Sequence, residues 1–384
     1  MRNKRLDILR CIAILLVMLY HGDSSLAIAD KGWIGVDLFF VLSGFLISGL
    51  LFSEYKAHGS IRFKRFFIRR GLKIYPAFYL YIFVTLVVSH FVLHWVGPAR
   101  HYVAEILFVQ NYWEGVWAHT WTLAVEEHFY VLLPILLVFL ARRHPERRDP
   151  FGVLPWIFLA VAVLCMSFRA VSACIGTPNY HTTYAATHAR IDSLFFGVLL
   201  GYFYHFRPHV LERLMGSTGN RLLVAVCSAG LLSPLFFYSR FTKFFAVFGY
   251  TCNYLAFGGI LLVALYHKGI LRGWIERAAR AVGTGLAMVG MYSYSIYLWQ
   301  GPGGAWLPGL LKRMFHVSFR GNARFAVYVV GSLVIGITMS KIVEYPVLRL
   351  RDRIFPPREG VVVRPSETIE EDRRSTTGVA NPAV

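Results

Sequence analysis

The chain has 384 residues, of which 56% are hydrophobic and only 16% are charged, and its mean hydropathy is +0.51. A soluble domain usually has about a quarter charged residues, so this composition excludes a soluble enzyme. The chain has 40 Lys and Arg residues and 21 Asp and Glu residues, which gives a net charge of +19. Because no nucleic-acid-binding motif accompanies this excess, it is typical of membrane topology, and we expect no nucleic-acid partner. The five Cys show no metal-ligand spacing, so we also predict no metal site.

Ten apolar segments are long enough to cross a bilayer as helices, since about 20 residues span the hydrocarbon core. They cover residues 6–22, 33–53, 74–96, 122–140, 151–172, 190–206, 222–239, 244–266, 282–304 and 325–345. With a cytoplasmic N-terminus, the cytoplasmic segments carry 24 Lys and Arg, about three times as many as the other loops. The sequence therefore predicts an all-α, polytopic transmembrane bundle with both termini cytoplasmic. A membrane domain covers 1–355, and a disordered tail covers 356–384.

The first segment carries three ionisable side chains on one face. At about 100° per residue, Asp7, Arg10 and His21 fall within about 60° of one another, and His21 lies roughly 16 Å beyond Arg10. One interpretation is a functional stripe through the membrane; the other is an interfacial Asp7–Arg10 pair with His21 at the lipid headgroups. The segment also resembles a signal peptide, but its internal charges favour an uncleaved span.

The second segment contains Asp37 a few residues from its start, and ionisable groups within spans are functional candidates by default. Its small residues Ser43 and Gly44 favour close helix packing. The following loop, 62–76, alternates basic and aromatic residues. That composition favours topology and contact with anionic lipid, and a site for a polyphosphate is the alternative.

The fourth and sixth segments open with charged groups on the same side of the membrane. Trp121 precedes the run Glu126-Glu127-His128, and Arg190 and Asp192 begin the sixth segment. Consecutive helical positions point about 100° apart, so only one glutamate easily faces a given cavity. Glu344, before Pro346, is typical of a cap at the interface.

Seven motifs, in order over roughly residues 5–350, resemble the acyltransferase-3 family of bacterial integral membrane O-acyltransferases. They are residues 6–10 with His21 eleven positions after Arg10, 35–45, 69–76, 121–130, 190–197, 294–298 and 344–346. Three departures stand out: Thr122 replaces the usual Ser, His128 replaces Gln, and Lys73 takes the second basic place of an Arg-x-x-Arg pattern.

The resemblance implies a multi-pass protein of the bacterial cytoplasmic (inner) membrane, surrounded by membrane lipids. It implies no permanently bound cofactor, an acyl-CoA co-substrate, most often acetyl-CoA, and a hydroxyl acceptor on a carbohydrate, such as a surface polysaccharide, or on a secondary metabolite. Because no esterase-like domain follows, we expect the acceptor to be acylated by the membrane domain or through a separate protein.

The resemblance also assigns roles. The CoA phosphates rest on Arg69, Arg70 and Lys73, and His21 acts as general base, for which an imidazole pKa near 6.5 is suited. Glu126 orients or charge-balances His21, while Arg10 positions the donor or pairs with Asp7. The remaining motif residues are assigned to substrate binding: Asp37, Ser43, Trp121, Arg190 and Asp192.

A transporter or flippase for a polar or lipid-linked substrate is the alternative function. Ten spans, basic loops and charges within spans fit it equally well. Transporters often show internal repeats and paired broken helices, and neither is evident in this sequence.

Overall fold

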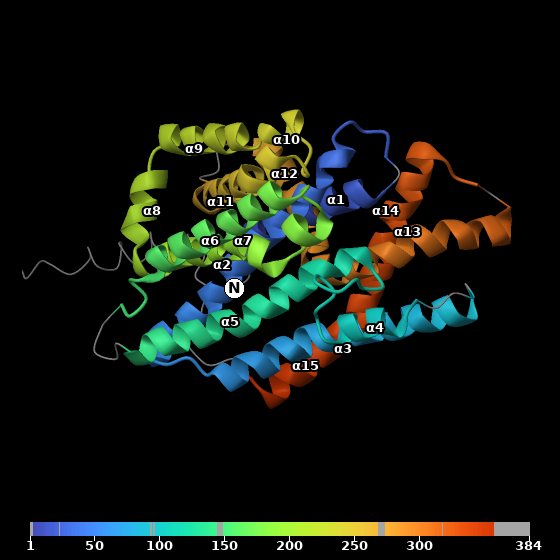
Figure 1. Ribbon diagram of the computed structural model, residues 1–384, viewed down its shortest axis with the longest axis horizontal. Helices are drawn as coiled ribbons and strands as arrows, with labels where there is room; N and C mark the ends of the chain where they lie inside the picture. The colour runs from blue at the N-terminus through green and yellow to red at the C-terminus, as the bar shows by residue number, and fades with distance from the viewer. Residues whose placement is uncertain are drawn as a thin grey trace, which may run out of the picture.

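A computed structural model describes residues 3–22, 24–92, 94, 97–143, 149–267, 273–316 and 318–356. Within these ranges helices are the only regular secondary structure, which confirms the all-α prediction (Figure 1). The α-helices are α1 (Lys4–His21), α2 (Gly35–His58), α3 (Phe63–Phe91), α4 (Ala99–Ile106), α5 (Trp121–Arg143), α6 (Leu154–Ile175), α7 (Thr187–Phe206), α8 (Pro208–Met215), α9 (Thr218–Leu231), α10 (Pro234–Phe237), α11 (Tyr250–Tyr266), α12 (Gly273–Met291), α13 (Ser293–Phe315), α14 (Gly321–Met339) and α15 (Tyr345–Ile354). Shorter 3₁₀ or π turns are η1 (Ala29–Ile34), η2 (Ala118–Thr120), η3 (Tyr180–Tyr184), η4 (Phe245–Gly249) and η5 (Ser340–Glu344).

Seven helical segments of the described chain are long and apolar enough to cross a membrane. They are Ala29–His58, Phe63–Phe91, Ala118–Arg143, Leu154–Ile175, Thr218–Phe237, Phe245–Tyr266 and Gly321–Ile354. These match seven of the ten predicted spans. The other three predicted spans, 6–22, 190–206 and 282–304, are also helical but carry more polar residues or a break.

The ninth predicted span is the clearest difference from the sequence prediction. Residues 282–304 do not form one helix, because α12 ends at Met291 and α13 begins at Ser293, with Tyr292 between them. The predicted disordered tail lies outside the described residues from position 357 onward.

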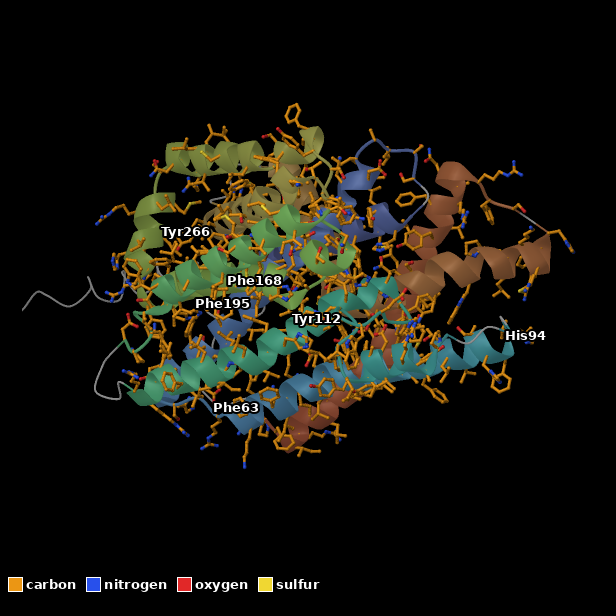
Figure 2. All side chains as sticks on the ribbon, in the orientation of Figure 1. Phe63, His94, Tyr112, Phe168, Phe195 and Tyr266 are labelled. Carbon is orange, nitrogen blue, oxygen red and sulfur yellow. The ribbon has the colours of Figure 1, made fainter. Side chains whose placement is uncertain are left out.

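Helices α2 and α7 form the centre of the bundle and pack along each other. Helix α1 packs against α2 and α12, and α11 packs against α2, α7 and α9. Helices α13 and α14 form a pair at the right of Figure 1, and α15 lies beside α3. Figure 2 shows Phe63 and His94 near the two ends of α3, which runs along the lower edge of the molecule. The chain thus brings α1, α2, α3, α5 and α13 together from distant parts of the sequence.

Close approach of α2 and α7 depends on two glycines. A Cβ on Gly44 would overlap the Leu194 carbonyl oxygen, and one on Gly197 would overlap the Val41 carbonyl oxygen. Small residues permit this backbone-to-backbone contact, which confirms the packing role predicted for Gly44. The contact fixes the position of Ser43, the neighbouring residue on α2.

Candidate functional site

A cavity of about 360 Å³ lies among α1, α2, α3, α5, α13 and α15. Three cations from two helices line it, and we call it the basic cavity. Its lining residues are Arg10, Val36, Phe39, Phe40, Ser43, Arg70, Lys73, Ile74, Thr122, Leu123, Glu126, Met291, Ser293, Tyr294, Tyr297, Glu344, Tyr345 and Leu348. Its volume is in the range usual for small-molecule sites.

Arg70 and Glu126 are two oppositely charged residues of the basic cavity lining. The Arg70 guanidinium carbon lies 4.1 Å from the centre of the Tyr130 ring. Glu126 accepts hydrogen bonds from the Ser43 hydroxyl at 2.9 Å and from the Tyr130 hydroxyl at 2.5 Å. Lys73, one turn after Arg70 on α3, lines the same space. The arrangement holds a guanidinium and an ammonium beside a fixed carboxylate.

Arg69 points away from this cavity. This is expected because Arg69 and Arg70 are adjacent on the helix and point about 100° apart. It pairs with Asp352 on α15 at 3.0 Å and donates to the Phe355 carbonyl oxygen. Of the three predicted phosphate-binding residues, Arg70 and Lys73 therefore line the cavity, whereas Arg69 ties α3 to α15.

The stripe predicted on α1 reaches two different cavities. Arg10 pairs with the buried Asp7 at 3.2 Å and lines the basic cavity. His21, an exposed residue at the end of α1, lines a second cavity of about 520 Å³, which we call the histidine cavity. Its lining residues are His21, Gly22, His119, Gln300, Gly301, Gly304, Arg324 and Tyr328.

The histidine cavity holds two imidazoles whose tautomers are set by the backbone. His21 Nδ1 lies 2.9 Å from the Val17 carbonyl oxygen, and His119 Nε2 lies 3.2 Å from the Leu298 carbonyl oxygen. Each of these nitrogens must donate, because a carbonyl oxygen only accepts. His21 Nε2 is therefore left as a lone-pair acceptor. The two ring centres are 6.5 Å apart.

A thin wall separates the two cavities, which share no lining residue. Tyr297, in the lining of the basic cavity, donates through its hydroxyl to the His119 carbonyl oxygen at 2.6 Å. The Thr122 hydroxyl lies 2.7 Å from the same phenol oxygen. On the other side of this contact, the His119 ring lines the histidine cavity. At this point a residue of one lining, Tyr297, directly contacts a residue of the other, His119.

Glu126 does not contact His21, although the resemblance implied that Glu126 orients or charge-balances this histidine. The carboxylate lines the basic cavity and its hydrogen bonds go to Ser43 and Tyr130, whereas His21 lies beyond the wall. Glu126 is therefore placed to balance Arg70 instead.

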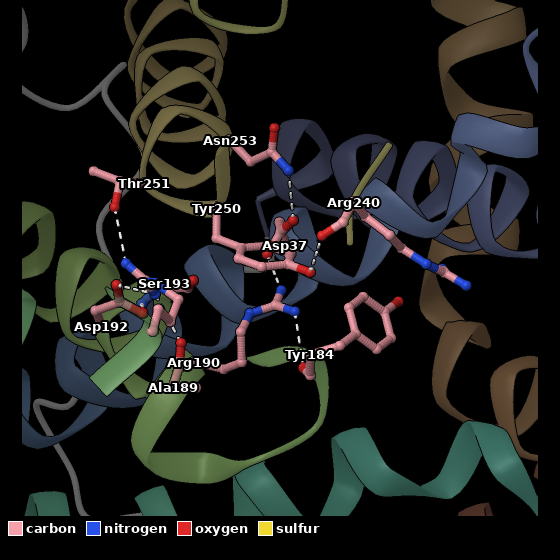
Figure 3. A network of polar contacts seen from close by, with 11 residues as sticks. Asp37, Tyr184, Ala189, Arg190, Asp192, Ser193, Arg240, Tyr250, Thr251 and Asn253 are labelled. Carbon is pink, nitrogen blue, oxygen red and sulfur yellow. Dashed lines mark hydrogen bonds and ion pairs between the residues drawn. The ribbon is translucent and has the colours of Figure 1, made fainter. Parts of the chain in front are cut away.

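A sealed ion pair joins α2 to α7 (Figure 3). Arg190 and Asp37 are fully buried and form an ion pair, and Arg190 also donates to the Tyr184 carbonyl oxygen at 3.0 Å. Asn253, from α11, donates to the second carboxylate oxygen of Asp37 at 2.9 Å. The guanidinium also lies 4.4 Å from the centre of the Tyr250 ring. These contacts hold the pair within the bundle, although the buried Arg190 Nε has no hydrogen-bond partner among the described residues.

A second buried pair joins α6 to α7. Arg169 binds Asp192 at 2.8 Å, and it also donates to the Ala189 carbonyl oxygen and to the Thr251 hydroxyl. Trp121 is likewise buried and lies beneath the Arg190 guanidinium. Of the residues assigned to substrate binding, only Ser43 lines either of the two cavities.

The sequence prediction gave no role in the site to four lining residues: His119, Gln300, Tyr297 and Glu344. The last two lie within the motifs 294–298 and 344–346. Glu344 was expected to cap a helix, yet it is buried in the basic cavity and accepts from the Ser295 and Ser340 hydroxyls. The spacing of residues on α13 could have predicted the cavity-lining face of this helix. Residues 294, 297, 301 and 304 follow at intervals of three, four and three, which places them on one helical face.

A family model for an acyltransferase domain matches residues 3–341 of this chain. A Staphylococcus aureus (strain COL) protein named "Putative O-acetyltransferase" is 29% identical over 323 residues, which cover 77% of this chain and 49% of that protein. The O-acetyltransferase OatA of Staphylococcus aureus (strain NCTC 8325 / PS 47) is 27% identical over 325 residues, covering 77% of this chain and 50% of OatA. The chain thus spans about half the length of the curated relatives it matches. No solved structure matches it.

Proposed function

This chain belongs to the acyltransferase-3 family, and from that premise we propose that it transfers an acyl group, most simply acetyl, from acyl-CoA to a hydroxyl. The acceptor class is a carbohydrate or a related secondary metabolite. The observation that carries the proposal is a basic cavity next to a histidine cavity, with Tyr297 of the first lining in contact with His119 of the second.

The donor binds at the basic cavity in this proposal. Arg70 and Lys73 supply the charge for CoA phosphates, and a guanidinium matches phosphate oxygens better than an ammonium does. Arg10, which also lines the cavity, positions the donor from the opposite helix. Arg69 supports the site by fastening α15 to the start of α3. No cofactor is needed beyond the acyl-CoA co-substrate.

His21 is the general base. Its Nδ1–H is held by the Val17 carbonyl, so Nε2 is available to take the proton of an acceptor hydroxyl. The hydroxyl oxygen then attacks the thioester carbonyl carbon, the carbon–sulfur bond breaks, and CoA leaves as a thiolate that is protonated to the thiol. The products are an ester and free CoA.

The thioester must cross the wall to meet this base. The Tyr297 hydroxyl holds the wall closed through His119 and Thr122. In this proposal Tyr297 rotates away from both residues to admit the thioester. Closing the wall before the acceptor arrives protects the thioester from water, as other enzymes do with mobile elements. Tyr297 is therefore a positioning residue for the donor.

The membrane setting follows from the seven apolar helices and the family. We place the protein in the bacterial cytoplasmic membrane, with both termini and the donor on the cytoplasmic side. Arg70 and Lys73 belong to the basic loop, 62–76, that the charge bias assigns to that side.

The test is release of CoA by the purified protein from acetyl-CoA and a crude glycan extract, with the labelled ester identified by mass spectrometry. We expect His21→Ala to lower turnover by roughly 10²–10⁴-fold, the usual contribution of a general base. His209→Ala, at an exposed histidine on α8, is the matched control. Wild-type turnover in His21→Ala contradicts the assignment of His21 as the general base. Transport of a glycan across a membrane without release of CoA identifies a transporter instead.

A further inference from the structure

Glu105 is a buried carboxylate that holds the turn carrying His119. Its side chain, on α4, is fully buried, although it lies in the connection between two predicted spans. Its Oε1 accepts hydrogen bonds from the Thr120 hydroxyl at 2.8 Å and from the Trp117 N–H at 3.2 Å. One donor comes just before η2 and the other at its end, so a single oxygen holds both sides of His119. We call these two hydrogen bonds the η2 clamp.

The turn η2 contributes to both parts of the proposed site. The His119 ring lines the histidine cavity, and the His119 carbonyl oxygen accepts the Tyr297 hydroxyl at the wall. A Cβ on Gly301, on α13, would lie 3.2 Å from the His119 ring and 3.4 Å from Trp117, so the turn packs closely against that helix. A shift of η2 therefore moves an imidazole of one cavity and an anchor of the wall together.

The surroundings of Glu105 leave little freedom to the carboxylate. A Cβ on Gly115 would lie only 2.6 Å from Glu105 Oε1, so no larger residue fits there. Gln110 donates to the Thr120 carbonyl oxygen at 3.0 Å and gives the end of the turn a second support. Glu105 Oε2, in contrast, is buried without a hydrogen-bond partner among the described residues. Ionisation in this position leaves a charged oxygen unsatisfied, which is costly.

Four other titratable groups belong to α4 and to the elements around Glu105. They are Tyr81 on α3, Tyr180 in η3, His119 in η2 and His101 on α4 itself. The phenols stay neutral below about pH 9, whereas the histidines can titrate in the same range as Glu105. An effect of pH is therefore assigned to Glu105 only where Glu105→Gln removes it.

Ionisation of Glu105 favours opening of the turn. Burial raises the pKa of this carboxyl to about 7 from an ordinary value of 4.5. An opened turn exposes the carboxyl to water and restores the ordinary value. The closed turn is therefore most stable below about pH 4.5, and its stability falls as the pH rises through about 7.

We propose that Glu105 is a positioning residue for the reaction: it fixes η2 so that His119 and its contact with Tyr297 keep the wall between the two cavities closed. The inference rests on the proposed acyl transfer, and it adds support of the wall by a helix outside the spans. Glu105 lines neither cavity and acts only through η2. Loss of the η2 clamp admits water to the thioester, and acetyl-CoA and water then yield acetate and free CoA.

Backbone hydrogen–deuterium exchange of residues 116–120, in the full-length purified protein, measures the η2 clamp without any substrate. Glu105→Ala removes both hydrogen bonds, so we expect exchange there to rise about tenfold at pH 4.5. Glu105→Gln keeps an oxygen acceptor and should stay within about twofold of wild type at this pH. Glu114→Gln, at an exposed carboxylate of the same connection, is the matched control.

The pH profile separates the η2 clamp from general structural support. Exchange is compared with the intrinsic amide rate at each pH. In wild type, opening of η2 should increase by up to about tenfold for each pH unit between about 4.5 and 7, and Glu105→Gln should show no such rise. Equal profiles for these two proteins, or unchanged exchange in Glu105→Ala, overturn the inference. If Glu105→Ala does not fold, the comparison of wild type with Glu105→Gln still decides.

Hydrolysis of acetyl-CoA without acceptor connects the η2 clamp to the site. At pH 4.5 we expect Glu105→Ala to raise the hydrolysis rate about fivefold, whereas Glu105→Gln and Glu114→Gln keep the wild-type rate. Equal rates in Glu105→Ala and wild type overturn the role of Glu105 at the wall. The expected exchange pattern in a wild-type protein that transfers no acetyl group instead contradicts the proposed function and leaves the η2 clamp standing.

Discussion

The membrane-embedded charges of this protein fall into two regions with opposite designs. In the core between α2, α6, α7 and α11, Asp37 and Arg190 are fully buried and are bound to each other and to Asn253. In the basic cavity, Arg70 and Glu126 are only partly buried and border open space. In the first region the charges are paired within the protein, whereas in the second the Arg70 side chain lines an open cavity.

A charge within a span is therefore not by itself a sign of a catalytic or binding site. Ionisable residues in membrane segments are functional candidates because their burial is costly. That cost is met either by a protein partner or by a ligand, and only the second case makes a binding site. Mutations should therefore have different effects in the two regions. Substitutions in the core should lower stability, whereas substitutions in the basic cavity should lower ligand affinity.

The largest effect is expected in the sealed core. Arg190→Met leaves Asp37 as an uncompensated buried charge, which should lower the free energy of unfolding by about 3–5 kcal/mol. Thermal unfolding in detergent and the yield of membrane-inserted protein measure this loss. Arg143→Met, at an exposed residue of α5, should change stability by less than about 0.5 kcal/mol.

A double variant sharpens this prediction. Asp37→Leu combined with Arg190→Met replaces the pair by apolar groups and should recover part of the stability that the single change loses. Equal stability of Arg190→Met and Arg143→Met would remove the distinction between the sealed core and the cavity.

Glu105, on α4 outside the spans, tests the cost of burial through pH. Burial raises the pKa of this fully buried carboxyl to about 7, although hydrogen bonds from the Thr120 hydroxyl and the Trp117 N–H oppose the shift. The unfolded carboxyl titrates near 4.5. The folded state therefore disfavours ionisation of Glu105. The contribution of this carboxyl to the free energy of unfolding should be greatest below about pH 4.5. It should fall as the pH rises through about 7, by at most about 3 kcal/mol.

The measurement is the melting temperature of wild type and Glu105→Gln across that pH range. The amide cannot ionise, so the variant should show a flatter profile, while Glu114→Gln, at an exposed carboxylate in the same loop region, should keep the wild-type profile. Parallel profiles for wild type and Glu105→Gln refute the assignment.

The smallest effect is expected at the wall between the cavities. Tyr297→Phe removes the hydroxyl that binds His119 and Thr122, at a cost of about 1 kcal/mol. A loosened wall should admit water to the thioester, so acetyl-CoA hydrolysis without acceptor should rise about fivefold. Tyr328→Phe, which leaves the wall intact, should not raise it; an unchanged rate in Tyr297→Phe would show that this contact does not separate donor from water.

The sequence predicted the helical class and much of the basic cavity, because periodicity and charge are local signals. Arg10 and His21 were placed on one face of α1 by their spacing, and both line cavities in the structure. Arg70 and Lys73 were found by their motif. The structure adds that the two ends of the stripe open into different cavities.

The remaining features depend on contacts between distant segments, which spacing does not report. Arg190 and Asp37 are 153 positions apart, so no local pattern reveals that they neutralise each other. The break at Tyr292 lies inside a continuous apolar run and has no proline or charge to mark it. His119 and Gln300 lie just outside the motifs 121–130 and 294–298, and only the fold brings them to the same cavity.

We propose that the donor binds in the basic cavity and that the base acts from the histidine cavity. The most direct measurement is the Kd of acetyl-CoA, by calorimetry, for wild type, Arg70→Ala and His21→Ala. We predict that Arg70→Ala raises Kd roughly ten- to hundredfold, as expected for loss of charge-assisted hydrogen bonds worth about 1.5–3 kcal/mol. His21→Ala should keep the wild-type Kd while it loses transfer. Equal donor affinity in Arg70→Ala and wild type, or loss of donor affinity in His21→Ala, would contradict this division of the site.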